Sequence, residues 1–182
     1  GLAPLLVFED ANLDQAVEGI MVAKFRNTGQ SCIAANRVYV QQPVYDAMLE
    51  RLAPKVRALK VGNGLEPEIQ IGPLVNQAAV VKAQEHVKDA LGRGARLICG
   101  GKALPGPGFF FEPTLLADVA KGSLCLVEET FAPVLPVLPF ESESEALELA
   151  NSTPFGLSAY AFTRDISRAF RLGESLEAGI IG

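Results

Sequence analysis

Apolar and polar residues follow one another in short blocks along the chain, and the period of these blocks changes repeatedly. Runs rich in β-branched and aromatic residues predict strands, whereas apolar residues at every third or fourth position predict helices. The predicted strands are 4–8, 37–40, 96–99, 109–116, 134–140, 158–162 and 179–181. The predicted helices are 13–25, 43–59, 77–91, 144–150 and 166–176. This alternation predicts an α/β fold with an open, mostly parallel sheet that carries helices on both faces.

A few residues indicate where these helices and strands begin, end or are interrupted. Asn12 is suited to cap the first helix, and Gly92 with Gly94 is suited to end the third. Pro54 should kink or shorten the second helix, because proline cannot donate the usual backbone hydrogen bond. Prolines within 109–116 and 134–140 predict edge strands or connections for the same reason.

Composition narrows the class of protein. The chain has 182 residues, 49% of them hydrophobic, which suits a single well-buried domain. No apolar run approaches the roughly 20 residues that span a membrane. The net charge of −5, without a basic cluster, argues against nucleic acid as a partner. Cys32, Cys99 and Cys125 form no CxxC pair and His86 is the single histidine, so no metal site is predicted. We expect a reducing, cytoplasmic compartment.

The glycines form no phosphate-binding motif. The runs Gly62-Asn63-Gly64 and Gly92-Arg93-Gly94 lack the third glycine of a dinucleotide fingerprint, and no P-loop pattern occurs. The chain therefore carries no phosphate cradle of its own.

Cys32 is the first candidate for chemistry. Gly29 allows a sharp turn just before this thiol, and the small residues Ala34 and Ala35 leave room beside it. A helical turn that began here would favour a thiolate and bind an oxyanion through its free N–H groups. The alternative is a buried, unreactive cysteine, which is the usual state of a free thiol.

The residues around Cys32 resemble the active-site signature of the aldehyde dehydrogenase superfamily. That signature is an aromatic or apolar residue followed by x-x-x-Gly-Gln-x-Cys and small residues, and it covers 25–36. Further motifs occur in the family's order, at 71–74, 99–101, 128–131 and 151–157. Within the superfamily, Lys24-Phe25-Arg26-Asn27 is most similar to the succinate-semialdehyde dehydrogenases.

The resemblance implies that residues 1–182 are an incomplete catalytic (thiol) domain. The nucleotide-binding domain and the C-terminal oligomerisation segment would then be absent, and the parent protein would be a homo-oligomer, a dimer or a tetramer. Gly1 matches the last glycine of the family's Glu-Leu-Gly-Gly motif, whose glutamate is the general base. We therefore expect that this chain alone does not turn over.

The same resemblance implies NAD- or NADP-dependent oxidation of a small aldehyde, most specifically succinic semialdehyde to succinate. The Cys32 thiolate would attack the aldehyde carbon, its backbone N–H would stabilise the oxyanion, and hydride transfer would leave a thioester for hydrolysis.

Three residues match cofactor-binding positions of the family. Glu129 matches the acid that binds the nicotinamide ribose, Phe131 the aromatic residue near the nicotinamide, and Lys82 a ribose-binding lysine. The alternatives are a surface acid, a core phenylalanine and a solvated lysine. Ala132 replaces the family's usual glycine, so a positive φ at Ala132 would add strain near the ribose.

Arg26 matches an arginine that succinate-semialdehyde dehydrogenases use for the substrate carboxylate. A guanidinium binds a carboxylate through two hydrogen bonds, which suits an aldehyde with a distal carboxylate. The alternative is an arginine in a surface salt bridge. Cys99 and Cys125 are interpreted as structural, and His86 as an ordinary residue of a helix face.

Two other classes of protein stay open. One is a silent scaffold or interaction domain that keeps the fold without the chemistry. The other is a cysteine acyl-transfer or hydrolytic enzyme, for which His86 is the only possible base. Within the family, a dehydrogenase for another ω-carboxylated or amino aldehyde is the main competitor.

Overall fold

A computed structural model of the chain describes residues 2–182, and the expectation attached to Gly1 lies outside them. Seven strands form one sheet in the order β3-β4-β5-β2-β1-β6-β7. All neighbouring strands are parallel except β3 and β4, which are antiparallel. The strands are β1 (Ala3–Val7), β2 (Ala35–Gln41), β3 (Arg96–Cys99), β4 (Thr114–Ala117), β5 (Val134–Phe140), β6 (Ser158–Phe162) and β7 (Ile180–Ile181).

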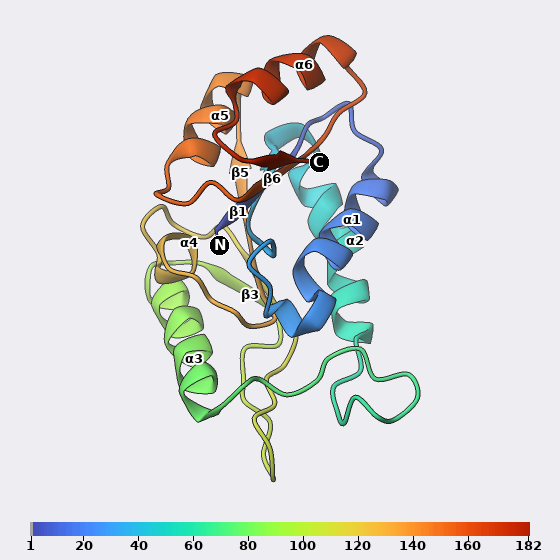
Figure 1. Ribbon diagram of the computed structural model, residues 1–182, viewed down its shortest axis with the longest axis vertical. Helices are drawn as coiled ribbons and strands as arrows, with labels where there is room; N and C mark the ends of the chain where they lie inside the picture. The colour runs from blue at the N-terminus through green and yellow to red at the C-terminus, as the bar shows by residue number, and fades with distance from the viewer. Residues whose placement is uncertain (1) are drawn as a thin grey trace.

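Helices cover both faces of this sheet, as predicted (Figure 1). Helices α1 and α2 pack on one face, whereas α3, α4, α5 and α6 pack on the other. The α-helices are α1 (Leu13–Phe25), α2 (Tyr45–Ala58), α3 (Gln77–Gly92), α4 (Leu124–Val127), α5 (Glu143–Asn151) and α6 (Ile166–Ser175). A kinked turn, η1 (Arg26–Gly29), precedes β2, and a 3₁₀ turn, η2 (Gln42–Val44), precedes α2. The predicted α/β architecture is confirmed.

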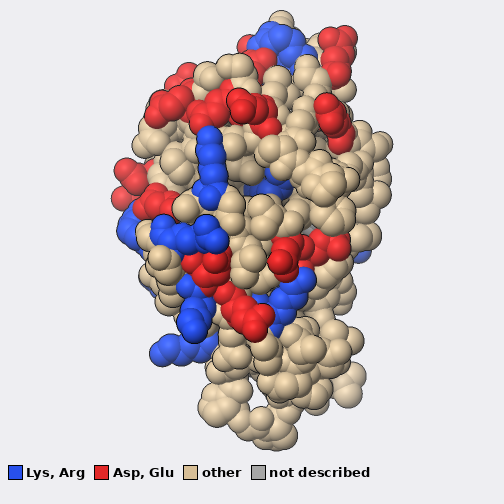
Figure 2. All heavy atoms as spheres, turned by 90° about the vertical axis from the view of Figure 1, so that its left-hand side faces the viewer, with Lys and Arg blue, Asp and Glu red and all other residues tan. Residues whose placement is uncertain are grey.

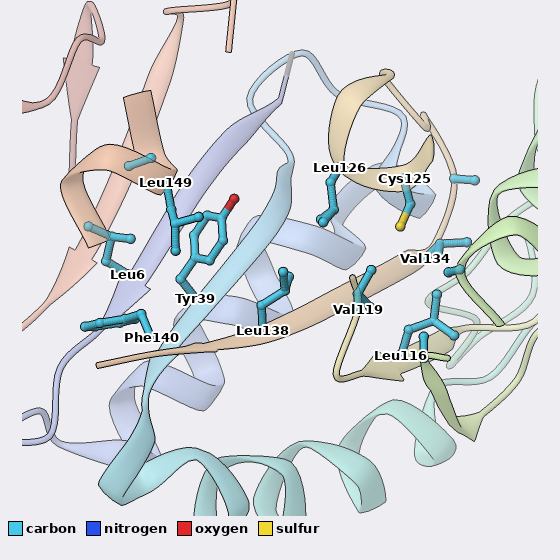
Figure 3. Packing of buried hydrophobic residues seen from close by; sticks show 14 of the residues in the cluster. Leu6, Tyr39, Leu116, Val119, Cys125, Leu126, Val134, Leu138, Phe140 and Leu149 are labelled. Carbon is cyan, nitrogen blue, oxygen red and sulfur yellow. The ribbon is translucent and has the colours of Figure 1, made fainter. Parts of the chain in front are cut away.

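The central strands β1, β2 and β5 are buried almost throughout, because helices cover both of their faces. Figure 3 shows the apolar side chains of one of the two resulting cores, which includes Tyr39, Leu138 and Phe140 from the sheet and Leu149 from α5. Phe8 meets the Phe140 ring edge to face, with ring centroids 5.3 Å apart. This packing fixes the strands whose amino ends carry the candidate site.

The structure departs from two of the expectations that were based on proline. Helix α2 continues through Pro54 to Ala58, so the helix is not shortened there. Strand β5 lies inside the sheet between β4 and β2, although it contains Pro136 and Pro139. Each proline removes only one donor from the ladder, and burial of both faces of β5 compensates for that loss.

Other boundaries hold or shift by a few residues. Asn12 caps α1 as predicted, because its side chain accepts hydrogen bonds from the backbone N–H groups of Asp14 and Gln15. The strand expected over 109–116 is confined to β4, and Phe111 makes only an isolated bridge. Helix α4 was not predicted, because a four-residue helix has too few positions to show a period.

Figure 2 shows the side of the molecule on which α3 and α5 lie. Acidic and basic side chains are interspersed there, and several form ion pairs between elements. Lys121, for example, lies 3.6 Å from Glu145. Among residues 2–182, no helix is long and apolar enough to cross a membrane.

Arg37, near the amino end of β2, joins three elements through hydrogen bonds of its side chain. Its side chain is 1% exposed and donates to the carbonyl oxygens of Leu2 (2.9 Å), Leu149 (3.0 Å) and Ala150 (2.8 Å). Two of these acceptors belong to the last turn of α5, where carbonyls lack helical partners. The guanidinium therefore joins β2 to the start of β1 and to the end of α5.

We expect Arg37→Met to lower the free energy of unfolding by about 3 kcal/mol, because three buried carbonyls lose their donor. Urea unfolding of the full-length protein, followed by circular dichroism, measures this loss. Arg57→Met is the matched control, since the exposed Arg57 donates to a single carbonyl, that of Ile98. Equal midpoints for the two variants would contradict the role given to Arg37.

Candidate functional site

Cys32 lies in the loop of residues 26–34, which joins α1 to β2 at the amino end of the sheet's central strands. Its side chain is exposed. The turn is closed by a hydrogen bond from the Ala34 N–H to the Ser31 carbonyl (3.2 Å), and β2 follows directly. No helix begins at Cys32, so the expected helical turn behind the thiol is replaced by this tight turn.

The backbone before the thiol is left-handed at three successive residues. Gly29 has φ +74°, as its predicted role in a sharp turn requires. Asn27 (φ 53°) and Thr28 (φ 59°) share this conformation, which costs a residue with a side chain roughly 1–2 kcal/mol. Such strain persists only where the surroundings hold it in place.

Segment 72–75 supplies those surroundings. The Thr28 hydroxyl oxygen accepts a hydrogen bond from the Gly72 N–H (3.0 Å). The Gln30 side-chain amide donates to the Pro73 carbonyl (3.1 Å) and accepts from the Val75 N–H (2.9 Å). The Cys32 loop is therefore anchored on the segment that contains the sequence motif at 71–74. The sequence did not indicate that Thr28 and Gln30 make these contacts.

A close backbone contact joins the 26–34 loop to the loop of residues 128–133. A Cβ atom on Gly29 would collide with the Ala132 carbonyl, so only glycine fits. Phe131, rather than Ala132, has the positive φ in this segment (47°), so the strain expected at Ala132 lies one residue earlier. Ala132 is fully buried against the thiol loop.

A buried lysine bridges the two ends of the 26–34 loop. The Lys24 ammonium at the end of α1 donates to the Asn36 side-chain oxygen at the start of β2 (2.6 Å), and both residues are at most 1% exposed. Burial lowers the pKa of Lys24 to about 7, and the nearby Cys125 thiol opposes this shift. Sequence reasoning missed this pair, because nothing in the pattern of α1 distinguishes a buried lysine from an exposed one.

Arg26 lines a cavity of about 680 Å³ that opens beside the thiol loop. Ser31 and Ile33, the two neighbours of Cys32, also line this cavity, whereas Cys32 does not. The Tyr160 hydroxyl of β6 donates to the Ile33 carbonyl (2.8 Å) and fixes that side of the wall. Arg26 and the thiol loop therefore share one cavity.

The three predicted cofactor residues lie on two adjacent segments. Lys82 projects from α3, and its ammonium lies 3.8 Å from the Glu128 carboxylate. Glu129 is half-buried, and Phe131 is 36% exposed. Segment 128–133 thus carries Glu129 and Phe131, and it meets Lys82 through Glu128.

His86 differs from the ordinary helix-face residue expected. It is 1% exposed, and its Nδ1 atom lies 3.2 Å from the Thr130 hydroxyl. No hydrogen bond joins it to Cys32 within residues 2–182. Burial raises the pKa of the Cys125 thiol to about 12 and also raises that of Cys99, which agrees with structural roles for both. In the part of the chain that the structure describes, no cluster of His, Cys, Asp and Glu is arranged to hold a metal ion.

Comparisons with known proteins identify the family of the chain. The model of the aldehyde dehydrogenase family matches residues 1–182. The NADP(+) succinate-semialdehyde dehydrogenase of Escherichia coli K12 is 51% identical over the whole chain. The 3-sulfolactaldehyde dehydrogenase of Pseudomonas putida is 50% identical over the same span. The chain covers 38% and 37% of these two relatives.

A solved structure gives the same result for the fold. The succinate-semialdehyde dehydrogenase of Burkholderia pseudomallei superposes with a TM-score of 0.98 at 49% identity, over all of this chain and 38% of that one. The chain therefore belongs to the aldehyde dehydrogenase family.

We expect Gly29→Ala to reduce the free energy of unfolding more than Gly122→Ala does. Both glycines are left-handed, with φ of +74° and +82°, but nothing lies within 4 Å of a Cβ on Gly122. Strain should cost each variant about 1–2 kcal/mol, and the collision with Ala132 about 1–3 kcal/mol more at Gly29. Urea midpoints of the full-length protein measure both, and equal losses would mean that the contact with Ala132 does not matter.

We also expect a pH dependence of stability that disappears in Lys24→Met. With its pKa lowered to about 7, Lys24 is neutral in the folded protein above pH 7 but charged in the unfolded chain. The unfolded state then binds more protons, so stability should rise from pH 7 to pH 8.5. Urea midpoints at these two pH values should differ in the wild type by more than in the variant. A difference of the same size in both would rule out the shift.

Proposed function

We propose that this chain is the thiol-bearing part of the catalytic domain of an NAD(P)-dependent aldehyde dehydrogenase. Its substrate would be an aldehyde with a distal anionic group, first of all succinic semialdehyde. The observation that carries the proposal is the combination of an exposed Cys32 with Arg26 on the wall of the adjoining 680 Å³ cavity, in a chain of this family.

The thiol loop supports covalent catalysis. The Cys32 thiolate adds to the aldehyde carbon, which forms a C–S bond and moves the carbonyl electron pair onto oxygen. The Cys32 backbone N–H is a donor for that oxyanion. Hydride loss leaves a thioester on Cys32, and attack by water releases the acid and restores the thiol. The hydrogen bonds of Thr28 and Gln30 to segment 72–75 would keep the Cys32 loop in place during these steps, which would reduce the entropy cost of the reaction.

Lys82, Glu129 and Phe131 support the binding of a nicotinamide nucleotide, which when bound would accept the hydride. A carboxylate and an ammonium are complementary to ribose hydroxyl groups, as acceptor and donor respectively. The partly exposed Phe131 ring offers an apolar surface to the nicotinamide. The chemistry of these residues therefore fits the group.

Arg26 supports the choice of substrate class. One relative is named for succinate semialdehyde and another for 3-sulfolactaldehyde, and both compounds have an anionic group away from the aldehyde. A guanidinium binds either a carboxylate or a sulfonate with parallel hydrogen bonds. Arg26 is exposed and lines the cavity, so it is available to such a group.

The two rival classes have less support. A cysteine hydrolase needs a base beside the thiol, but His86 is engaged with Thr130. A silent scaffold domain has no need of an exposed thiol that follows a strained turn. Another aldehyde within the family is the competitor that the following experiment separates.

In the full-length enzyme, we expect NAD(P)H formation with succinic semialdehyde to exceed that with butanal, and Cys32→Ala to abolish both. Arg26→Ala should lower kcat/KM for succinic semialdehyde by roughly 10–100-fold, the loss expected for a charged hydrogen bond, and leave butanal unchanged. Arg51→Ala, which removes an exposed arginine paired with Asp14, is the control.

The outcomes separate the two parts of the proposal. If wild type and Arg26→Ala each had the same kcat/KM for succinic semialdehyde and butanal, the proposed substrate class would be refuted, but the proposed aldehyde oxidation would stand. Turnover in Cys32→Ala, or none in the wild type with any aldehyde, would refute the chemistry. A preference for 3-sulfolactaldehyde over succinic semialdehyde, lost in Arg26→Ala, would keep Arg26 as the anion-binding residue and replace the named substrate.

A further inference from the structure

His86 is a buried polar group that the proposed mechanism does not use. Its Nδ1 atom contacts the Thr130 hydroxyl (3.2 Å), and its Nε2 atom lies 3.5 Å from the Glu128 carboxylate. Within the described residues, Nε2 is buried and lacks a hydrogen-bond partner. Buried polar atoms are nearly always paired, so an orphaned nitrogen aimed at a carboxylate needs an explanation.

The two contacts of the imidazole fall on either side of Glu129. Thr130 is 2% exposed and faces the core, whereas the Glu128 side chain is 52% exposed and also meets Lys82. One turn further along α3, the Asp89 carboxylate accepts a hydrogen bond from the Leu124 N–H (2.8 Å). One face of α3 therefore holds the segment from α4 to Thr130 at several points.

The chemistry of the ring matches both neighbours in a single tautomer. Burial and the nearby Lys82 lower the pKa of His86, which favours the neutral ring, whereas Glu128 and Asp89 act in the opposite direction. A neutral ring with its proton on Nε2 accepts from the Thr130 hydroxyl at Nδ1 and points a donor at Glu128. The assignment of the proton follows from these partners.

We propose that His86 is a positioning residue for nucleotide binding. Its imidazole contacts Thr130 and Glu128, the two neighbours of Glu129 in the chain, and thereby fixes the position of Glu129. The inference rests on the proposed function. When Lys82 turns to the ribose, Glu128 loses its ammonium partner and the Nε2–H of His86 remains to hold it. The small gap at Nε2 closes with a shift of a few tenths of an ångström, as is common when a ligand completes a site.

Substitutions of His86 in the full-length enzyme test each contact separately. His86→Asn keeps a polar group near the position of Nδ1, His86→Gln keeps one near Nε2, and His86→Leu removes both. We expect His86→Leu to weaken binding of NAD+ and NADP+ about tenfold, the loss of one charge-assisted hydrogen bond, with smaller losses in the other two. Glu85→Gln, an exposed change on the same helix, is the control.

Calorimetric titration of each variant with both nucleotides gives the affinity, and steady-state kinetics gives KM for nucleotide and for aldehyde. Support requires weaker nucleotide binding with an unchanged aldehyde KM, weaker binding in Thr130→Val, and recovery in Thr130→Ser. Unchanged nucleotide affinity in all the His86 variants overturns the inference, as does an equal rise in both KM values.

Direct titration also separates this inference from the proposed function. A wild type that binds nucleotide but oxidises no aldehyde removes the proposed function, and weaker binding in His86→Leu still supports the positioning role. A wild type that binds neither nucleotide overturns both. Should His86→Leu fail to fold, the Asn and Gln variants, which fit the same space with polar groups, decide the question by the same titration.

Discussion

The left-handed turn at residues 27–29 is the constraint on which the candidate site depends. Two of its three residues have side chains, so the turn is unfavourable unless the rest of the protein holds it. Thr28 and Gln30 supply that support by binding the backbone of segment 72–75. A sequence distant from the thiol thus determines where the sulfur lies.

The sheet supplies the rigid frame for this turn. Strands β1, β2 and β5 are buried on both faces, and Lys24 with Asn36 joins the two ends of the thiol loop within the core. Ligands of open α/β sheets usually bind outside the carboxyl ends of the strands. Here the thiol loop precedes β2 and the 128–133 loop precedes β5, so the candidate site lies at the amino ends. Motif spacing alone would not place it on this side.

The sequence predicted the fold class, the helices on both faces and most element boundaries, because buried parallel strands and amphipathic helices leave strong local patterns. It failed at the prolines of β5, where burial outweighs the loss of a backbone donor, and Pro54 does not shorten α2. The family signature pointed to Cys32 and Arg26, and their catalytic and binding roles stay predictions. Lys24 and His86 went unrecognised, since burial of a polar side chain depends on contacts between distant segments that no local pattern records.

The contact between Gly29 and Ala132 has a mechanical consequence. Backbone touches backbone there with no side chain between them, so neither segment has a flexible spacer to absorb a displacement of the other. A closely packed interior transmits such a displacement rather than dissipating it. A displacement of the segment that carries Glu129 and Phe131 is therefore passed directly to the segment that carries the thiol, through the main chain.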